Sequence, residues 1–201
     1  MDTLDLDALR RLYPAPKERA LKKQLDHLDV HCQRFIALSP YVVLASGGSS
    51  GALDASPRGG APGFVQVVDP HTLLIPDAPG NNRLDTLQNV ASTGRLGLLF
   101  MVPGVEETLR INGTATLSTR ADWLDLCTNE RRRPVLVIAV KVDEAYLHCA
   151  KALMRSKLWS PDSVQARSCL PTAGEMLRDH TGIDTPAETP EAMRARYEPD
   201  L

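Results

Sequence analysis

This chain of 201 residues has few aromatic side chains and no excess of positive charge. Phe, Trp and Tyr make up 4% of it, and its formal net charge at pH 7 is -2. Proteins that bind nucleic acid present a basic surface, and those that bind single strands stack bases on aromatic rings. We therefore expect no nucleic-acid partner, and we interpret the basic run Arg131-Arg132-Arg133 as part of a solvated loop.

Long apolar segments and closely spaced cysteines are also absent. No stretch reaches the roughly 18 apolar residues of a membrane helix, and the acidic start Met1–Asp7 lacks the basic residues of a signal peptide. The adjacent pair His148-Cys149 has no second ligand pair at zinc-finger spacing. The four cysteines form no C-x-x-C pair: Cys32, Cys127, Cys149 and Cys169. We expect a reduced, cytoplasmic protein without a metal or a membrane segment.

The length favours one domain over residues 16–170, with an N-terminal arm over 1–15 and a C-terminal extension over 171–201. Apolar residues at three-four spacing predict a helix over 16–39, which Ser39-Pro40 ends. A shorter helix is expected over 122–129, a helical or mixed segment over 144–157, and a helix over 173–180 that is followed by a loosely ordered tail. Residues 47–63 are rich in Gly, Ser and Pro and are expected to form a loop.

Six apolar or alternating segments, joined mostly by short turns, predict strands. The segments are Tyr41–Ser46, Phe64–Val68, Thr72–Ile75, Leu96–Val102, Thr108–Leu117 and Val135–Val142. They do not alternate with helices, as they would in a parallel sheet. The fold class expected is therefore mainly β, an antiparallel barrel with flanking helices.

The segment Gly47-Gly48-Ser49-Ser50-Gly51 fits the G-x-S-x-G pattern of hydrolases. That motif requires a helix directly after the serine, and the residues that follow here are not helical in character. A hydrolase that uses Ser49 is kept as an alternative only.

A candidate anion site lies at the end of the fourth predicted element. Leu73–Pro76 reads as a strand, a Pro/Gly turn follows, and Leu84, Leu87 and Val90 then recur at helical spacing. Asn82 is a typical N-cap residue, and Arg83 would take the first helical position. A helix start with an adjacent Arg favours a phosphate, because it offers unpaired N–H groups and a fixed positive charge.

Other polar residues could complete such a site. Ser56 and Arg58 follow the first strand, and Thr108 and Arg110 share one face of a later strand. Lys151 and Arg155 are four apart on a predicted helix, with Trp159 one turn further on. We expect that together they line one anionic ligand with a flat ring.

The sequence resembles the FMN-binding split-barrel flavoproteins related to pyridoxamine 5'-phosphate oxidase, over about residues 16 to 162. Within that family it is similar to a bacterial subgroup of FMN-dependent proteins. The segments that carry the resemblance are Ser56–Gly59, Gly63–Val65, Leu74–Asp77, Pro79–Asp85, Gly97–Phe100, Pro103-Gly104, Glu107–Gly113 and His148–Ser156.

The resemblance implies a split β-barrel that binds FMN in a cleft between the two subunits of a homodimer. It assigns Ser56 and Arg58 to the ring and ribityl chain, and Asn82, Arg83 and Thr86 to the phosphate. It places Thr108 and Arg110 on a strand beside the flavin. It also implies that three residues reach the cofactor from the partner subunit: Lys151, Arg155 and Trp159. The function implied is an FMN-dependent oxidoreductase that acts on a small molecule.

Two departures limit the analogy. Gly60 stands where this subgroup tends to have an acidic residue, and the chain ends Arg196–Leu201 without the Arg/Trp signature that binds the vitamin B6 substrate in the oxidase itself. Pyridoxamine phosphate oxidation is therefore an alternative, as is a non-catalytic module that binds flavin, haem or a deazaflavin. No catalytic acid or base is identified; His148 is a candidate, but the sequence favours a structural role.

Overall fold

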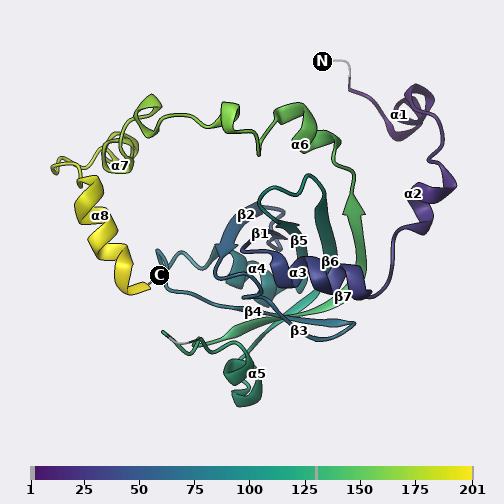
Figure 1. Cartoon of the computed structure of the whole chain (residues 1–201), viewed down its shortest axis with the longest axis horizontal. Coiled ribbons are helices and arrows are strands. Elements are labelled where there is room, and N and C mark those ends of the chain that lie inside the picture. The colour runs from purple at the N-terminus through teal and green to yellow at the C-terminus, as the bar shows by residue number, and fades with distance from the viewer. Residues whose placement is uncertain (1–2, 130, 201) are drawn as a thin grey trace.

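In a computed structural model, which describes residues 3–129 and 131–200, a curled β-sheet forms the body of the protein (Figure 1). Met1, Asp2 and Leu201, at the ends of the expected arm and extension, lie outside the described residues. Within the described residues the sheet has seven strands, in the order β2-β1-β5-β6-β7-β4-β3. Every pairing is antiparallel, which confirms the expected class. The strands are β1 Tyr41–Gly47, β2 Leu53–Gly59, β3 Gln66–Asp69, β4 Thr72–Pro76, β5 Arg95–Met101, β6 Thr108–Ser118 and β7 Val137–His148.

The helices flank this sheet or extend from it. They are α1 Leu6–Leu12, α2 Glu18–Lys22, α3 Val30–Leu38, α4 Asp85–Thr93, α5 Ala121–Leu126, α6 Lys151–Ser156, α7 Ala173–Thr181 and α8 Pro190–Tyr197. Short 3-10 turns occupy Pro161–Ser163, Arg167–Cys169 and Glu198–Asp200. No helix in the described ranges is long and apolar enough to cross a membrane.

The single helix predicted over residues 16–39 is wrong. It is divided into α2 and α3, because Leu25 pairs with β7 through two backbone hydrogen bonds to Ala145, of 3.0 and 2.8 Å. Asp29 then starts α3, since its carboxylate accepts the backbone N–H of Cys32. The three-four spacing was real for α3, where Cys32 and Ile36 are buried.

Three other segments are more regular than predicted. The expected loop over 47–63 contains β2, which pairs with β1 in register from Tyr41 opposite Gly59 to Gly47 opposite Leu53. Strand β7 continues through His148, so the expected helical segment is helical only in α6. The tail contains α8, capped by the Thr189 side chain, beside the correctly predicted α7.

Two apolar clusters pack against opposite faces of the sheet. The main one lies inside the curl of the sheet and includes Val42, Leu44, Phe100 and Leu109, all fully buried. The second joins Leu124 of α5 to the other face of β4 and β7. Helix α5 therefore covers the second apolar face of β7, which requires no partner chain there.

A β-bulge in β7, opposite Asn112 and Gly113 of β6, allows the long β6–β7 pair to bend. The register shifts between Asn112 and Gly113, and Asp143 on β7 is left without a pairing partner. A Cβ on Gly113 would lie 2.1 Å from the carbonyl oxygen of Lys141, so the close backbone approach requires glycine.

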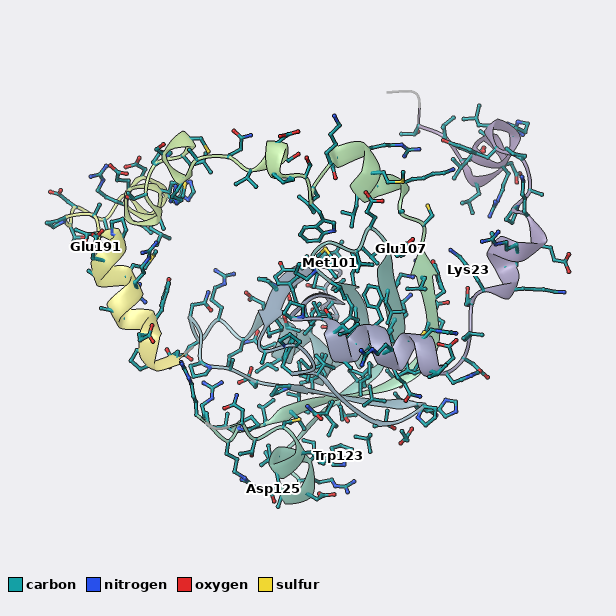
Figure 2. The ribbon with its side chains drawn as sticks, in the orientation of Figure 1. Lys23, Met101, Glu107, Trp123, Asp125 and Glu191 are labelled. Carbon is teal, nitrogen blue, oxygen red and sulfur yellow. The ribbon has the colours of Figure 1, made fainter. Side chains whose placement is uncertain are left out.

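The two ends of the chain extend from the barrel in opposite directions (Figure 2). Trp159 ties the start of the C-terminal segment to the barrel, while α7 and α8 lie apart from the sheet in Figure 1. They pack on each other, with Gly174 close to the backbone of Glu188.

Candidate functional site

The start of α4 is the centre of the candidate site. Strand β4 leads into a loop in which Asn82 and Leu84 both have left-handed backbone conformations, with φ of 58° and 60°. Helix α4 therefore begins at Asp85, and neither Asn82 as N-cap nor Arg83 as first helical residue is correct. Asn81, which the sequence analysis did not single out, accepts the backbone N–H of Arg83 at 3.1 Å. The predicted cap failed because the left-handed turn brings the chain into the helix two residues later.

This geometry leaves the helix start available to an anion. The N-cap residue Leu84 makes no capping hydrogen bond, and no side chain in the described ranges accepts from the N–H groups of the first turn of α4. Arg83 lies beside them, 71% exposed at its side chain, and its Nε donates to Asp85 at 2.8 Å. The hydrogen bond and charge of Asp85 raise the pKa of Arg83, so the guanidinium is permanently charged. Its terminal nitrogens remain for another acceptor.

An unpredicted carboxylate, Asp54 on β2, organises the residues beside this helix start. It accepts hydrogen bonds from the hydroxyls of Thr86 at 2.5 Å, Ser56 at 2.7 Å and Ser46 at 3.3 Å. The alternation Asp54, Ser56, Arg58 places all three side chains on one face of β2. That alternation was visible in the sequence, but it was masked by the surrounding Gly, Ser and Pro residues.

Two positive charges lie in the field of Asp54. Burial raises its pKa, but the hydrogen bonds from Thr86, Ser56 and Ser46 and the charge of Arg58 outweigh burial and lower it. The charge of Asp54 in turn helps to raise the pKa of Arg83. The structure thus brings Ser56, Arg58, Arg83 and Thr86 together, with Asn82 in the adjoining loop.

The second predicted group lies on the opposite face of the sheet. Arg58 shares a face with Val42, Phe100 and Leu109, whereas Thr108 and Arg110 point to the other side of β6. One protomer therefore cannot bring the two groups to the same side of its sheet.

Arg110 belongs to a polar network on that other face. It donates to Glu144 at 2.8 Å and stacks 4.4 Å from the Tyr146 ring. Glu144 also accepts from Asn112 and from Gln24, both at 2.6 Å. The Nε of Arg110 is buried and has no hydrogen-bond partner among the described residues, so this cation keeps an unused donor.

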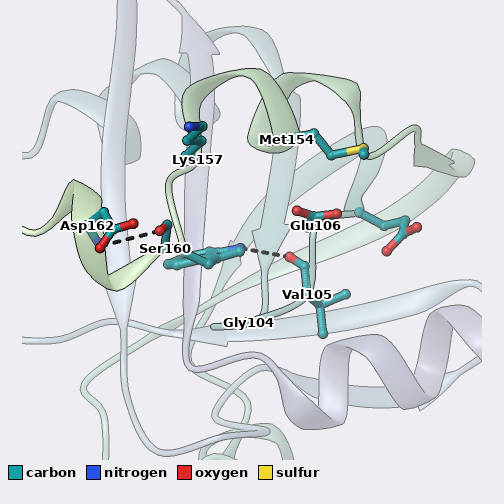
Figure 3. Close-up of a pocket in the computed structure, with 9 residues that line it drawn as sticks. Gly104, Val105, Glu106, Met154, Lys157, Ser160 and Asp162 are labelled. Carbon is teal, nitrogen blue, oxygen red and sulfur yellow. Dashed lines mark hydrogen bonds between the residues drawn. The ribbon is translucent and has the colours of Figure 1, made fainter.

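The third predicted group lies at the end of the barrel, near the turn between β5 and β6. Figure 3 shows Val105 at this turn, and its carbonyl oxygen accepts the indole N–H of Trp159 at 2.9 Å. Lys151 and Arg155 are exposed on α6, and no ion pair links either to the described residues. Trp159 lines a hollow of about 710 Å³ together with Glu106, Glu107 and Met154.

A second hollow, of about 720 Å³, lies at the other end of the sheet. Asp54 and Ser46, which are hydrogen-bonded to each other beside α4, form part of its lining. It continues over Gly97, Asn112 and Glu144 on the second face. Its size is typical of small-molecule sites. Its lining includes residues from both faces of the sheet, but neither Arg58 nor Arg83.

The structure adds no support for Ser49 as a nucleophile or for His148 as a catalytic acid or base. The turn around Ser49 joins two strands and is not followed by a helix, so the requirement of a nucleophile elbow is not met. His148 is half-buried, and burial together with the charges of Arg110 and Lys23 lowers its pKa. No group of His, Cys, Asp and Glu in the described ranges is arranged to hold a metal ion.

Known proteins resemble this chain over the same region. The profile of a family described as "Pyridoxamine 5'-phosphate oxidase" matches residues 28–149, which is more than half of the chain and lies within the expected domain of residues 16–170. No curated protein sequence matches it.

Solved structures resemble it at low sequence identity. A crystal structure of HupZ from Group A Streptococcus superposes with a TM-score of 0.50 and 15% identity, covering 59% of this chain and 92% of that one. A second HupZ structure gives 0.50 and 14%, with 60% and 99% covered. A candidate pyridoxamine 5'-phosphate oxidase from Lactobacillus delbrueckii gives 0.48 and 19%, with 62% and 98% covered. The family match and the likeness to the two HupZ structures confirm the expected split-barrel fold.

Proposed function

Because this chain belongs to the pyridoxamine 5'-phosphate oxidase family, we propose that it is an FMN-binding flavoprotein that oxidises or reduces a small molecule. The phosphate of FMN lies at the start of α4 in this proposal. Arg58 and Arg83 bind it, while Ser56 and Asn82 lie beside the phosphate and the ribityl chain.

One observation carries the proposal. The first turn of α4 has no capping side chain, and an exposed guanidinium stands at its entrance with terminal donors to spare. A helix start and a forked cation together suit a phosphate better than a neutral or cationic group. The residues present therefore fit the phosphate end of the cofactor.

The bound flavin supplies the redox chemistry, and the protein contributes binding, orientation and charge. Arg110 and Tyr146 offer a donor and a ring edge on the second face of the sheet, and Glu144 holds Arg110 in place. No side chain is assigned here as general acid or base.

The placement of the predicted residues on two opposite faces supports a homodimer. A single ligand could meet Arg58 and Arg83 together with Thr108 and Arg110 if the second pair came from a partner chain. In this proposal Lys151, Arg155 and Trp159 also act from the partner subunit. The second face of β5, which includes Leu99, is apolar and only half-buried in the protomer, and it provides the contact surface.

The test is an absorption spectrum of the purified protein followed by a competition titration. We expect flavin bands, and riboflavin binding about a hundredfold weaker than FMN because it lacks the phosphate. A Soret band would favour a haem-binding module, and a colourless protein that takes up no flavin would contradict the proposal. Equal affinity for riboflavin and FMN would overturn the phosphate assignment alone. Turnover of pyridoxamine 5'-phosphate by the loaded protein would establish the alternative substrate.

A further inference from the structure

The hydrogen bonds around Asp54 determine which way the nearby hydroxyl groups point. An ionised carboxylate can only accept, so Ser46, Ser56 and Thr86 must all direct their protons toward it. Each hydroxyl has a single proton. None of the three can therefore donate a hydrogen bond to a phosphate.

Of these three hydroxyls, Ser56 is the one open to a ligand. Thr86 is 2% exposed and Ser46 is 6% exposed, and the Ser46 oxygen already accepts from Asn89 at 3.0 Å. Ser56 is half-buried on the edge strand, and its oxygen has no donor among the described residues. Ser56 thus presents an acceptor next to Arg58, two residues along the same face.

We propose that Asp54 is a positioning residue that makes this site specific for a phosphate carried on a polyol rather than for a free phosphate. This inference rests on the proposed function. Asp54 orients Ser56 so that it accepts a proton from a ligand hydroxyl, while Arg58, Arg83 and the start of α4 take the phosphate. The carboxylate also repels a small dianion that could move deeper between the two guanidinium groups. A ligand whose phosphate is held at a distance by its own chain avoids that repulsion.

The substitution Asp54→Asn separates the two effects. It removes the negative charge, and its amide oxygen takes the position to which both Ser46 and Thr86 donate, so the amide N–H faces Ser56. Ser56 must then accept that N–H, and its own proton is turned outward. We expect inorganic phosphate to bind about tenfold more tightly and ribitol 5-phosphate about tenfold more weakly than in the unmodified protein.

Calorimetric titrations with inorganic phosphate, ribitol 5-phosphate and FMN measure this. Asp122→Asn is the matched control, because it also removes a carboxylate but lies on α5; it should leave all three affinities unchanged. If Asp54→Asn changes the affinities for inorganic phosphate and ribitol 5-phosphate by the same factor and in the same direction, Asp54 has only a structural role and the inference is wrong.

A second variant covers a failure of Asp54→Asn to fold. Ser56→Ala should weaken the binding of ribitol 5-phosphate and leave the affinity for inorganic phosphate unchanged. Equal effects on the two affinities would also overturn the inference. Failure of the proposed function is read separately. If FMN does not bind but the two flavin-free probes respond as expected, the proposed cofactor is wrong and the role of Asp54 stands.

Discussion

Arg83 and Asp54 have opposite charges and opposite roles at the start of α4. Arg83 is exposed and, among the described residues, forms an ion pair with Asp85 alone, whereas Asp54 accepts hydrogen bonds from three hydroxyls. The Arg83 guanidinium can therefore bind a ligand, whereas the Asp54 carboxylate is occupied by hydrogen bonds within the protein. Substitutions at these two positions should therefore have different consequences for binding and for stability.

We predict that Arg83→Ala lowers FMN affinity about a hundredfold with little change in thermal stability. Charge-assisted hydrogen bonds to a phosphate are among the stronger polar contacts, whereas an exposed ion pair such as that with Asp85 contributes little to folding. Titration of the apo variant with FMN, beside a melting curve, tests this. Arg133→Ala, which removes an arginine paired with Asp125 on α5, is the control. Unchanged affinity would remove Arg83 from the site.

Asp54 gives the fold a defined response to acid. Its pKa is lowered in the folded chain from an ordinary value of 3.8, so its ionised form stabilises the fold at pH values above 3.8. That stabilisation is lost as the pH falls below 3.8 through the folded-state pKa. We therefore expect Asp54→Asn to lose less stability than the unmodified protein over that range, as measured by urea unfolding at a series of pH values. Parallel curves for the two proteins would show that Asp54 is not ionised and bonded as described.

At the level of elements, pairing across the sheet overrides local pattern in two places. Leu25 carries helical spacing but pairs with β7, and residues 53–59 carry the composition of a loop but pair with β1. In both, backbone groups next to an open strand edge gain partners that an isolated helix or loop would not provide. Strand β2, and with it Asp54, Ser56 and Arg58, exists because the edge of β1 is open to it.

The bulged β6–β7 pair is sensitive to a single methyl group added at Gly113. We expect Gly113→Ala to destabilise the fold by about 2–3 kcal/mol, because the new Cβ would overlap the carbonyl oxygen of Lys141 in the neighbouring strand. For a chain of this size that corresponds to a fall in melting temperature of about 4–12 °C, measured by calorimetry. Gly80→Ala is the control, since its Cβ would meet no atom within 4 Å and the melting temperature should hardly change. A melting temperature for Gly113→Ala equal to that of the control would mean that the bulge relaxes freely.

For the whole molecule, the distribution of the candidate residues over two faces is the main constraint. Helix α5 covers the first half of β7, so in the proposed dimer a partner chain is needed only over β5. The second face of β1, β2 and β5 presents apolar side chains that are exposed or half-buried, among them Tyr41, Leu53 and Leu99. The same face meets the hollow that contains Asn112 and Glu144.

We predict a dimer of about twice 22.0 kDa by light scattering at micromolar concentration. Leu99→Lys on the second face of β5 should give a monomer and also weaken FMN binding, although Leu99 lies on the face opposite to Arg58. Leu117→Lys, at the far end of β6, should leave both properties unchanged. A monomer that still binds FMN tightly would contradict the dimer and the roles given to Lys151, Arg155 and Trp159.

The sequence by itself determined the strands whose apolar residues repeat over a full element. Alternation located β6, continuous apolar runs located β5 and the first half of β7, and the Asp69–His71 turn located the β3–β4 hairpin. These are local properties, since the period of the side chains follows from the backbone conformation alone. The sequence did not distinguish the four cysteines: burial raises the pKa values of Cys32 and Cys127 to about 12 and about 11, whereas Cys149 and Cys169 are exposed.

Only the tertiary structure decided where α4 begins, that β2 exists, and that Asp54 lies among Ser46, Ser56 and Thr86. The left-handed conformations of Asn82 and Leu84 depend on how β4 enters the loop, and the partners of Asp54 come from three separate elements. It also placed Arg58 and Arg110 on opposite faces, which depends on the register of four strands. A one-residue slip in any of those registers would exchange the faces, and no pattern within a single segment specifies the register between segments.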